Sequence, residues 1–368
     1  MRQLTGGATD RLARSRAILD ATGADGLLVS SPATQRWLAG FILEQGEEHH
    51  RGWSGTLLVT RDAALVMVDA RYLEQATEQC GGWDVRLTNG EIGAGVAALT
   101  RELGARCLAA EGEAVPHADW AAVAAAGLEL LAADDAFRRL RLLKDADEVA
   151  AIRRAGALTE ECFTHLLDWL RPGQTERQVA WEIETWFRTN GAEALAFGPL
   201  VLAGARGSMP HGHAEDVPLA VGQPLLIDFG CQVDGYRSDM TRTVSFGEPS
   251  PRFRERYDAV RAAQAAAFEA ARPGVAGSAL DGVAREVLTA AGLGEAFSHG
   301  LGHGIGLETH EAPMLLDWHE PLEAGMVFTL EPGVYFAGQM GIRIEDDVHL
   351  TEQGAVRLTD APRELLVL

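Results

Sequence analysis

The first third of the chain alternates between two hydrophobic patterns. Between residues 11 and 22, apolar side chains recur at helical spacing, with Leu12, Ile18 and Leu19 on one face. Short apolar runs follow that are too short for typical helices, and we interpret them as buried strands. They lie at 26–30, 56–60 and 64–69, with a weaker one at 108–111. Strands that alternate with helices predict a small α/β domain.

The rest of the chain has longer helical patterns followed by hairpins. Helices are predicted at about 145–170, 175–190, 251–272 and 278–291, and strands up to about 246 and around 298–311, 326–336 and 341–350. A charged stretch at 134–147 predicts a solvated linker that enters a helix. At roughly 150 residues per domain, we predict two domains, 1–138 and 139–368.

Composition and charge narrow the classes of function. The chain has 32 Lys plus Arg and 53 Asp plus Glu, a net charge of −21, which argues against a nucleic-acid partner or an anionic membrane surface. Residues 1–10 lack the apolar core of a signal peptide, and no run approaches the ~20 apolar residues of a membrane span. The four cysteines are scattered without a C-x-x-C pair. These features predict a soluble cytoplasmic protein without a disulfide framework.

The first candidate site is a hairpin at 225–243, with the sequence LLIDFGCQVDGYRSDMTRT. An Asp-Gly turn at 234–235 would place Asp228 opposite Thr241, and Asp239 would share that face. Two carboxylates this close repel each other unless a cation lies between them. The alternative is a pair of surface acids on an exposed hairpin, but the apolar neighbours of Asp228 favour burial.

A second hairpin at 328–348, FTLEPGVYFAGQMGIRIEDDV, repeats this arrangement. A turn at 338–341 would bring Glu345 back opposite Glu331, and Arg343 would share a face with Glu345. The two hairpins together would supply four carboxylates from apolar strands. The alternatives are an edge acid next to proline for Glu331, and a surface ion pair of little energetic value for Arg343 and Glu345.

Between the hairpins lies a segment rich in histidine and glycine, 298–311, SHGLGHGIGLETHE. His299 and His303 are four apart, but the alternating glycines disfavour a helix and favour an extended segment that another backbone or a substrate approaches closely. Three histidines within twelve residues, His310 included, favour a site over isolated structural imidazoles. His211, in a turn-like stretch, is a weaker candidate.

Four carboxylates with one imidazole form an oxygen-rich ligand set. Such a set suits Mn²⁺, with Co²⁺ and Zn²⁺ as alternatives. It exceeds what one catalytic ion needs and suits two ions roughly 3.5–4 Å apart with a bridging water. Such a pair lowers the pKa of the water and polarises a carbonyl, which favours amide hydrolysis.

The motifs IDFG, YRSDMTRT, SHGLGHGIGLETHE, LEPGVY and GIRIEDD in combination resemble those of the pita-bread (M24) metallopeptidases, in the branch of prolidase (Xaa-Pro dipeptidase) and aminopeptidase P. The resemblance is strongest from 197 to 347 and covers nearly the whole chain. It implies an α/β creatinase-like N-terminal domain and an α+β pita-bread catalytic domain. It also implies a homodimer that cleaves the bond before proline in small peptides with proline at the second position.

The resemblance further implies a role for individual residues. Glu331 would accept a proton from the bridging water in addition to binding metal. His299 would lie near the proline subsite, with Tyr335 and Arg343 close by and Arg343 steering the carboxyl end of the substrate. His211 and His310 would hydrogen-bond the substrate. The implied metal ligands are Asp228, Asp239, His303, Glu331 and Glu345.

A preference for dipeptides over longer peptides requires a cation that binds the free carboxylate of the proline. Arg51, in a predicted loop of the first domain, offers a cation suited to that carboxylate. It favours a dipeptidase over aminopeptidase P, although the charged run could equally be a solvated loop. Less favoured are a methionine aminopeptidase, a creatinase-like amidinohydrolase, and a non-catalytic relative that has lost its metal ligands.

Overall fold

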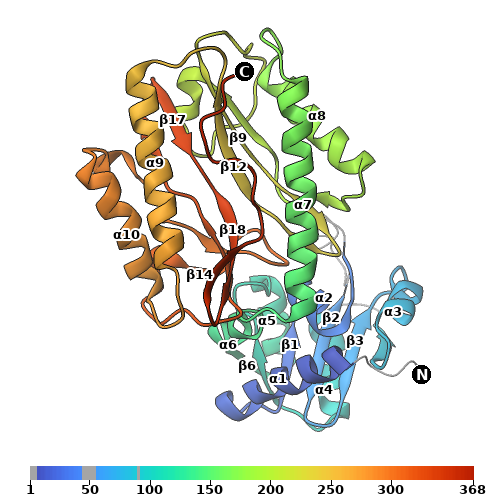
Figure 1. The fold of residues 1–368 in the computed structure, drawn as a ribbon. Helices are drawn as coiled ribbons and strands as arrows, with labels where there is room; N and C mark the ends of the chain where they lie inside the picture. Colours follow the sequence, from blue (N-terminus) through green and yellow to red (C-terminus); the bar gives the residue numbers. More distant parts are fainter. Residues whose placement is uncertain (1–5, 44–54, 89–91) are drawn as a thin grey trace. The chain divides into compact units, whose positions relative to one another are not determined.

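The computed structural model describes residues 6–43, 55–88 and 92–368 of the chain. The chain forms two compact units, Met1–Arg141 and Leu142–Leu368 (Figure 1). Residue 138, where we predicted the domain boundary, lies inside the last helix of the first unit. Among the described residues, no helix combines the length and the apolar composition that a membrane crossing requires.

The first unit contains a six-stranded mixed sheet in the order β4-β3-β2-β1-β5-β6. Each apolar run that we predicted as a strand lies in this sheet. The edge strands β4 and β6 were missed because their side chains are half exposed, so neither carries a continuous apolar run. The strands are β1 (Gly26–Val29), β2 (Thr56–Thr60), β3 (Ala64–Val68), β4 (Asp84–Leu87), β5 (Cys107–Ala110) and β6 (Glu129–Ala132). The helices are α1 (Gly6–Thr22), α2 (Pro32–Ala39), α3 (Leu73–Gln79), α4 (Ile92–Glu102), α5 (His117–Ala125) and α6 (Asp134–Leu140).

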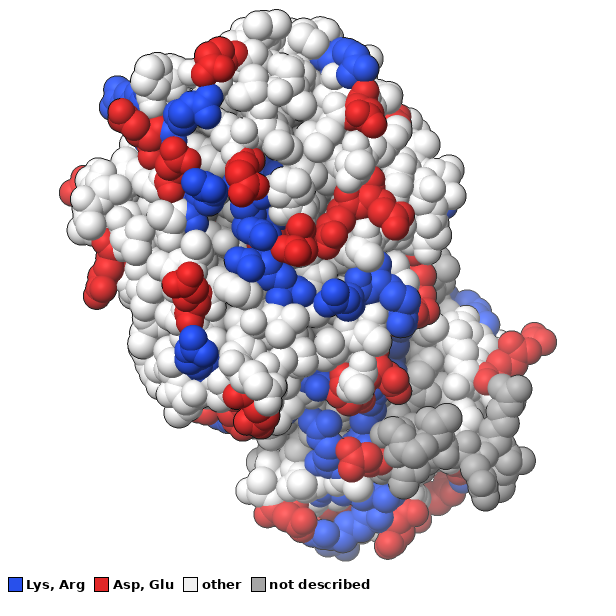
Figure 2. All heavy atoms as spheres, in the orientation of Figure 1, with Lys and Arg blue, Asp and Glu red and all other residues white. Residues whose placement is uncertain are grey.

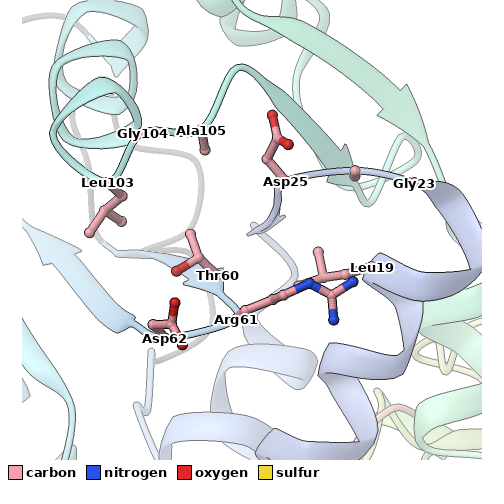
Figure 3. A pocket seen from close by; sticks show the side chains of 10 residues that line it. Leu19, Gly23, Asp25, Thr60, Arg61, Asp62, Leu103, Gly104 and Ala105 are labelled. Carbon is pink, nitrogen blue, oxygen red and sulfur yellow. The ribbon is translucent and has the colours of Figure 1, made fainter.

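A surface pocket of the first unit is lined by loop ends around Asp25, Arg61 and Asp62 (Figure 3). Two of these charged groups already have partners. Asp25 accepts hydrogen bonds from two backbone N–H groups, and Arg61 pairs with Asp20 at 2.5 Å. We assign no ligand to this pocket.

The second unit packs two pairs of helices against curved β-ribbons (Figure 1). Helices α7 and α8 cover one apolar core, built on β8, β9 and β12, and helices α9 and α10 cover another, built on β15 to β18. The helices are α7 (Ala146–Trp169), α8 (Glu176–Thr189), α9 (Pro251–Ala270) and α10 (Gly277–Ala290), with short 3-10 turns η1 (Gly204–Ser208), η2 (Gly294–Ala296) and η3 (Leu315–Asp317).

The strands of this unit form four small sheets, in the orders β11-β10-β7, β12-β9-β8, β14-β13-β15-β18-β19 and β16-β17. They are β7 (Ala194–Leu195), β8 (Leu200–Ala203), β9 (Pro224–Phe229), β10 (Cys231–Val233), β11 (Tyr236–Arg237), β12 (Met240–Ser245), β13 (His303–Gly304), β14 (Glu311–Met314), β15 (Val327–Leu330), β16 (Gly333–Phe336), β17 (Met340–Arg343), β18 (Asp346–Thr351) and β19 (Gly354–Arg357).

The charged stretch 134–147 is not the solvated linker that we predicted. It contains helix α6, and its Lys144 is buried in an ion pair with Glu311 at 2.6 Å. The acidic residues that follow do begin a helix as predicted, because Asp145 and Glu148 form a capping box at the start of α7. Charge alone did not distinguish a buried lysine from a solvated one.

Acidic and basic side chains are interspersed on the face of the molecule shown in Figure 2. Lys and Arg gather in a band there, bordered by Asp and Glu. The net charge of −21 is therefore not spread as a uniform acidic surface on this face.

Candidate metal centre

The first predicted hairpin forms with the predicted register. Asp228 on β9 pairs with Thr241 on β12, and the chain reverses at Asp234 and Gly235, both with positive φ. Asp239 comes directly before β12. The side chains of Asp228 and Asp239 are buried, with residue exposures of 8% and 4%. The alternative of two surface acids is therefore wrong.

The second hairpin is interrupted at its two acidic residues. Strand β15 pairs with β18, with Leu330 opposite Asp346, and β16 pairs with β17, with Gly333 opposite Arg343. The same register on both sides of the interruption places Glu331 opposite Glu345, as predicted. Arg343 and Glu345 are 3% and 2% exposed, so they are not a surface ion pair.

The glycine-rich segment is extended and tightly packed. A Cβ atom on Gly302 would lie 2.0 Å from the carbonyl oxygen of Thr329, and one on Gly304 would lie 2.1 Å from that of Ala312. The segment is therefore not a helix, and its glycines permit close backbone approach as predicted. The strand over 298–311 is shorter than expected, because β13 contains two residues, one of which is His303.

Three buried side chains converge beside this segment. Ligand atoms of Asp239, His303 and Glu345 all lie within 4.8 Å of one another. Nε2 of His303 lies 3.8 Å from Oδ2 of Asp239 and 3.4 Å from Oε1 of Glu331. Nδ1 of His303 lies 3.1 Å from the carbonyl oxygen of Gly304, which can only accept, so Nδ1 carries the proton. The lone pair of Nε2 is therefore available toward the carboxylates.

The electrostatics of this cluster favour either bound protons or a bound cation. Burial raises the pKa of Asp239 and Glu345, and each is raised further by neighbouring carboxylates. Burial also raises the pKa of Glu331 to about 8 and lowers that of His303 to about 3. Oδ1 of Asp239 is buried without a hydrogen-bond partner within the described part of the chain. A divalent cation would supply the missing partner, so these residues fit a metal site.

Asp228 is held beside the cluster by a buried arginine. Arg343 donates from Nη2 to Oδ2 of Asp228, from Nε to Oγ1 of Thr241 at 3.0 Å, and from Nη1 to the hydroxyl of Tyr335 at 2.6 Å. Oδ1 of Asp228 has no hydrogen-bond partner among the described residues. One oxygen of Asp228 is thus fixed by Arg343, and the other is available to a cation.

The remaining predicted histidines surround the cluster. Nε2 of His299 lies 2.9 Å from the Tyr335 hydroxyl, and the His310 ring lies 4.2 Å from that of His303. His211 is exposed in a turn after η1. Burial lowers the pKa of His299 and His310. The carbonyl oxygen of Pro210, directly before His211, lies 3.5 Å from Nη1 of Arg343, so the chain at His211 borders the same region. Arg51 lies outside the described residues.

Comparison with known families agrees with this geometry. The model of metallopeptidase family M24 matches residues 150–352, and that of the creatinase/prolidase N-terminal domain matches residues 11–143. The chain belongs to metallopeptidase family M24. The prediction of a creatinase-like domain followed by a pita-bread catalytic domain is confirmed.

Solved structures from this family match almost the full length of the chain. An Xaa-Pro dipeptidase from Bacillus anthracis is 35% identical with a TM-score of 0.92, covering 98% of this chain and 100% of that one. An X-Pro aminopeptidase from Thermotoga maritima is 34% identical with a TM-score of 0.88, covering 97% and 99%. An Xaa-Pro dipeptidase from Pyrococcus furiosus is 42% identical over 63% of this chain and 67% of that protein.

Our sequence reasoning missed three polar residues that hold the candidate ligands of this M24 protein. Thr241 donates to Oε2 of Glu345 at 2.5 Å, and Thr329 donates to Oε1 of Glu331 at 3.3 Å. Asp347 accepts a hydrogen bond from the backbone N–H of Asp239 at 2.9 Å. Each lies two residues from a candidate ligand on an extended segment, so the period of two could have identified all three.

Proposed function

We propose that this M24 protein hydrolyses the peptide bond before proline in small peptides, with Xaa-Pro dipeptides as its favoured substrates. The observation that carries the proposal is the buried convergence of carboxylate oxygens on the unprotonated Nε2 of His303. The similarity to solved Xaa-Pro dipeptidases supports the choice of substrate. Aminopeptidase P activity on longer Xaa-Pro-Xaa peptides is the second candidate, because the Thermotoga enzyme is nearly as similar.

We propose that the site holds two divalent ions, with Mn²⁺ favoured because most ligand atoms are carboxylate oxygens, and with Co²⁺ and Zn²⁺ as alternatives. When bound, such ions polarise a carbonyl and lower the pKa of a water molecule. The proposed ligands are Asp228, Asp239, His303, Glu331 and Glu345. Asp228 keeps its orientation through Arg343.

Glu331 is the proposed proton acceptor. Its carboxylate lies in the cluster, with Oε1 3.4 Å from Nε2 of His303, and once deprotonated it can take a proton from an attacking water and release it during turnover. The hydroxyl of Thr329 fixes one oxygen of this carboxylate. We propose that His211 and His310 hydrogen-bond the substrate from the exposed side of the site.

His299 and Tyr335 have a separate proposed role. His299 and Tyr335 would line the proline side of the site, joined by the hydrogen bond between them. Steering of the substrate's carboxyl end by Arg343 stays a prediction, because its guanidinium donates hydrogen bonds to Thr241, Tyr335 and Asp228.

We propose a cytoplasmic homodimer whose residues 139–368 carry the catalytic residues. All four cysteines are free, which fits a reducing compartment.

A substrate panel tests the proposal. Protein reconstituted with Mn²⁺ should hydrolyse Ala-Pro faster than Ala-Pro-Ala and should not process Ala-Ala or Met-Ala-Ser at a comparable rate, with metal content measured in parallel. Faster turnover of Ala-Pro-Ala would indicate aminopeptidase P. Turnover of Met-Ala-Ser alone would indicate a methionine aminopeptidase. Protein that takes up no divalent metal at micromolar concentration would indicate a non-catalytic relative.

Arg51 provides a test of substrate length. Replacing it with alanine should raise KM for Ala-Pro by roughly 10- to 100-fold, because a charge-assisted hydrogen bond to the free carboxylate contributes roughly 1.5–3 kcal/mol. KM for Ala-Pro-Ala should stay within about twofold. Arg61→Ala, which removes an exposed arginine of the same unit, is the control. Equal effects of the Arg51 change on the two peptides would rule out this role.

A further inference from the structure

One ion pair on helix α10 contacts the loop that precedes β13, next to the candidate metal centre. Asp281 and Arg285 lie one helical turn apart, and the guanidinium binds the carboxylate with two bonds, of 2.9 and 3.0 Å. The Asp281 side chain is 4% exposed. This two-bond geometry fixes the plane of the guanidinium and aims its other N–H groups.

Both members of the pair hold the loop that precedes β13. Arg285 donates to the carbonyl oxygens of Phe297 at 3.1 Å and His299 at 2.9 Å, and the Leu301 N–H donates to Asp281 at 2.8 Å. The guanidinium carbon lies 4.3 Å from the centroid of the Phe297 ring, which meets the His299 ring edge-on at 5.1 Å. The backbone at residues 297, 299 and 301 is therefore held by the side chains of Asp281 and Arg285.

The loop in turn fixes the proton positions on His299. Its Nδ1 lies 2.8 Å from the carbonyl oxygen of Gly300, which can only accept, so Nδ1 carries the proton. Nε2 must then accept the hydrogen bond from the Tyr335 hydroxyl, whose oxygen accepts from Arg343. Each group in this chain therefore donates a hydrogen bond to the next one: Arg343 to Tyr335, Tyr335 to His299, and His299 to the backbone of this loop.

We propose that Asp281 and Arg285, here called the α10 clamp, are positioning residues that set His299 and the Tyr335 hydroxyl for substrate binding. The identity of the substrate rests on the proposed function. The clamp holds the loop through backbone groups of residues 297–301, and its contacts are not with the side chains of the candidate metal ligands. Its loss should therefore affect KM more than metal uptake.

The experiment compares two arginines with similar helical partners. Arg285→Met removes the donors and keeps an unbranched side chain. Arg188→Met is the matched control, since Arg188 bonds Glu184 one turn away on α8 and belongs to an exposed pair. With Mn²⁺ bound, Arg285→Met should raise KM for Ala-Pro about tenfold, which is of the order expected for the loss of charge-assisted hydrogen bonds. Its kcat and its Kd for Mn²⁺ should stay within about threefold of the wild-type values. Arg285→Lys should recover part of the loss, because one ammonium group can still reach a carbonyl.

A readout independent of catalysis separates this inference from the proposed function. In ¹⁵N-histidine NMR spectra of the metal-free protein, with His299 assigned through His299→Gln, wild type should show the Nδ1-protonated tautomer. Arg285→Met should shift the signal toward a tautomer average, and Arg188→Met should leave it unchanged. If wild type fails to cleave Ala-Pro, the proposed substrate is wrong and the NMR comparison still decides the role of the clamp. An unchanged His299 signal in both Arg285 variants, or a KM that matches the Arg188 control, would overturn the inference.

Discussion

Replacing Glu331 with glutamine is expected to lower kcat for Ala-Pro by about a thousandfold, within the range for removal of a general base. Glutamine has nearly the same shape and keeps an oxygen toward His303, which lies 3.4 Å from the carboxylate, but it cannot accept a proton. The fold should persist, because Thr329 can still donate to the amide oxygen. Kinetics on the Mn²⁺-loaded variant, with metal content measured on the same sample, provide the test.

Metal content separates two explanations for a loss of activity. If the variant binds Mn²⁺ like wild type and has lost activity, Glu331 acts in proton transfer, whereas a parallel loss of metal would assign it mainly to binding. Glu323→Gln, at an exposed position before β15, is the matched control and should keep wild-type kcat. A kcat for Glu331→Gln within about tenfold of wild type would contradict the proton-transfer role.

The registers of the two acidic hairpins could be predicted because turn chemistry and the period of two act over short distances. An Asp-Gly turn determines which residue lies opposite Asp228, and the Gly-containing turn of the second hairpin does the same for Glu331. The glycines flanking His303 indicated close backbone approach from the sequence alone, because any larger residue would place a Cβ there, and a Cβ at Gly302 would lie 2.0 Å from the carbonyl oxygen of Thr329.

Contacts between elements distant in sequence could not be predicted in this way. Lys144 looked solvated, but Glu311 neutralises it from a position far along the chain. Arg343 looked like the partner of Glu345, but it donates to Asp228 on the other hairpin. Local charge spacing predicted a solvated linker around Lys144 and left a surface ion pair as the alternative for Arg343. In both cases the three-dimensional fold supplied a buried partner from a distant part of the chain.

The metal-free protein is expected to lose stability as the pH rises from about 6.5 to 7.5. Burial raises the pKa of Asp239, Glu331 and Glu345 in the folded state, that of Glu331 from its usual 4.5 to about 8. In this range the folded state holds protons that the unfolded state has released, so the free energy of unfolding falls with pH. Each retained proton contributes about 1.4 kcal/mol per pH unit. Retention of one to three protons corresponds to a loss of roughly 1–4 kcal/mol over the range.

The pH window lies at and above the usual pKa of histidine, so the contribution of His299 and His303 is small and falls as the pH rises. Burial lowers the pKa of His303 to about 3 and that of His299 to about 4, so these groups make stability rise with pH up to their usual value of 6.5. In the unfolded state they are about half protonated at pH 6.5 and about one tenth protonated at pH 7.5, so their opposing contribution fades across the range. The carboxyl groups, which keep their protons in the folded state, determine the sign of the slope toward pH 7.5.

The measurement is the Tm of the catalytic unit's unfolding transition across this range, with and without saturating Mn²⁺. Without metal, Tm should fall by roughly 2–16 °C, at about 2–4 °C per kcal/mol for a unit of this size. With Mn²⁺ the fall should vanish or reverse, because metal binds the deprotonated ligands more tightly as pH rises. Glu331→Gln cannot carry the extra proton, so its metal-free slope should be shallower by about one proton. A metal-free Tm that stays level or rises over this range would contradict the raised pKa values and the case for a cation-binding cluster built upon them.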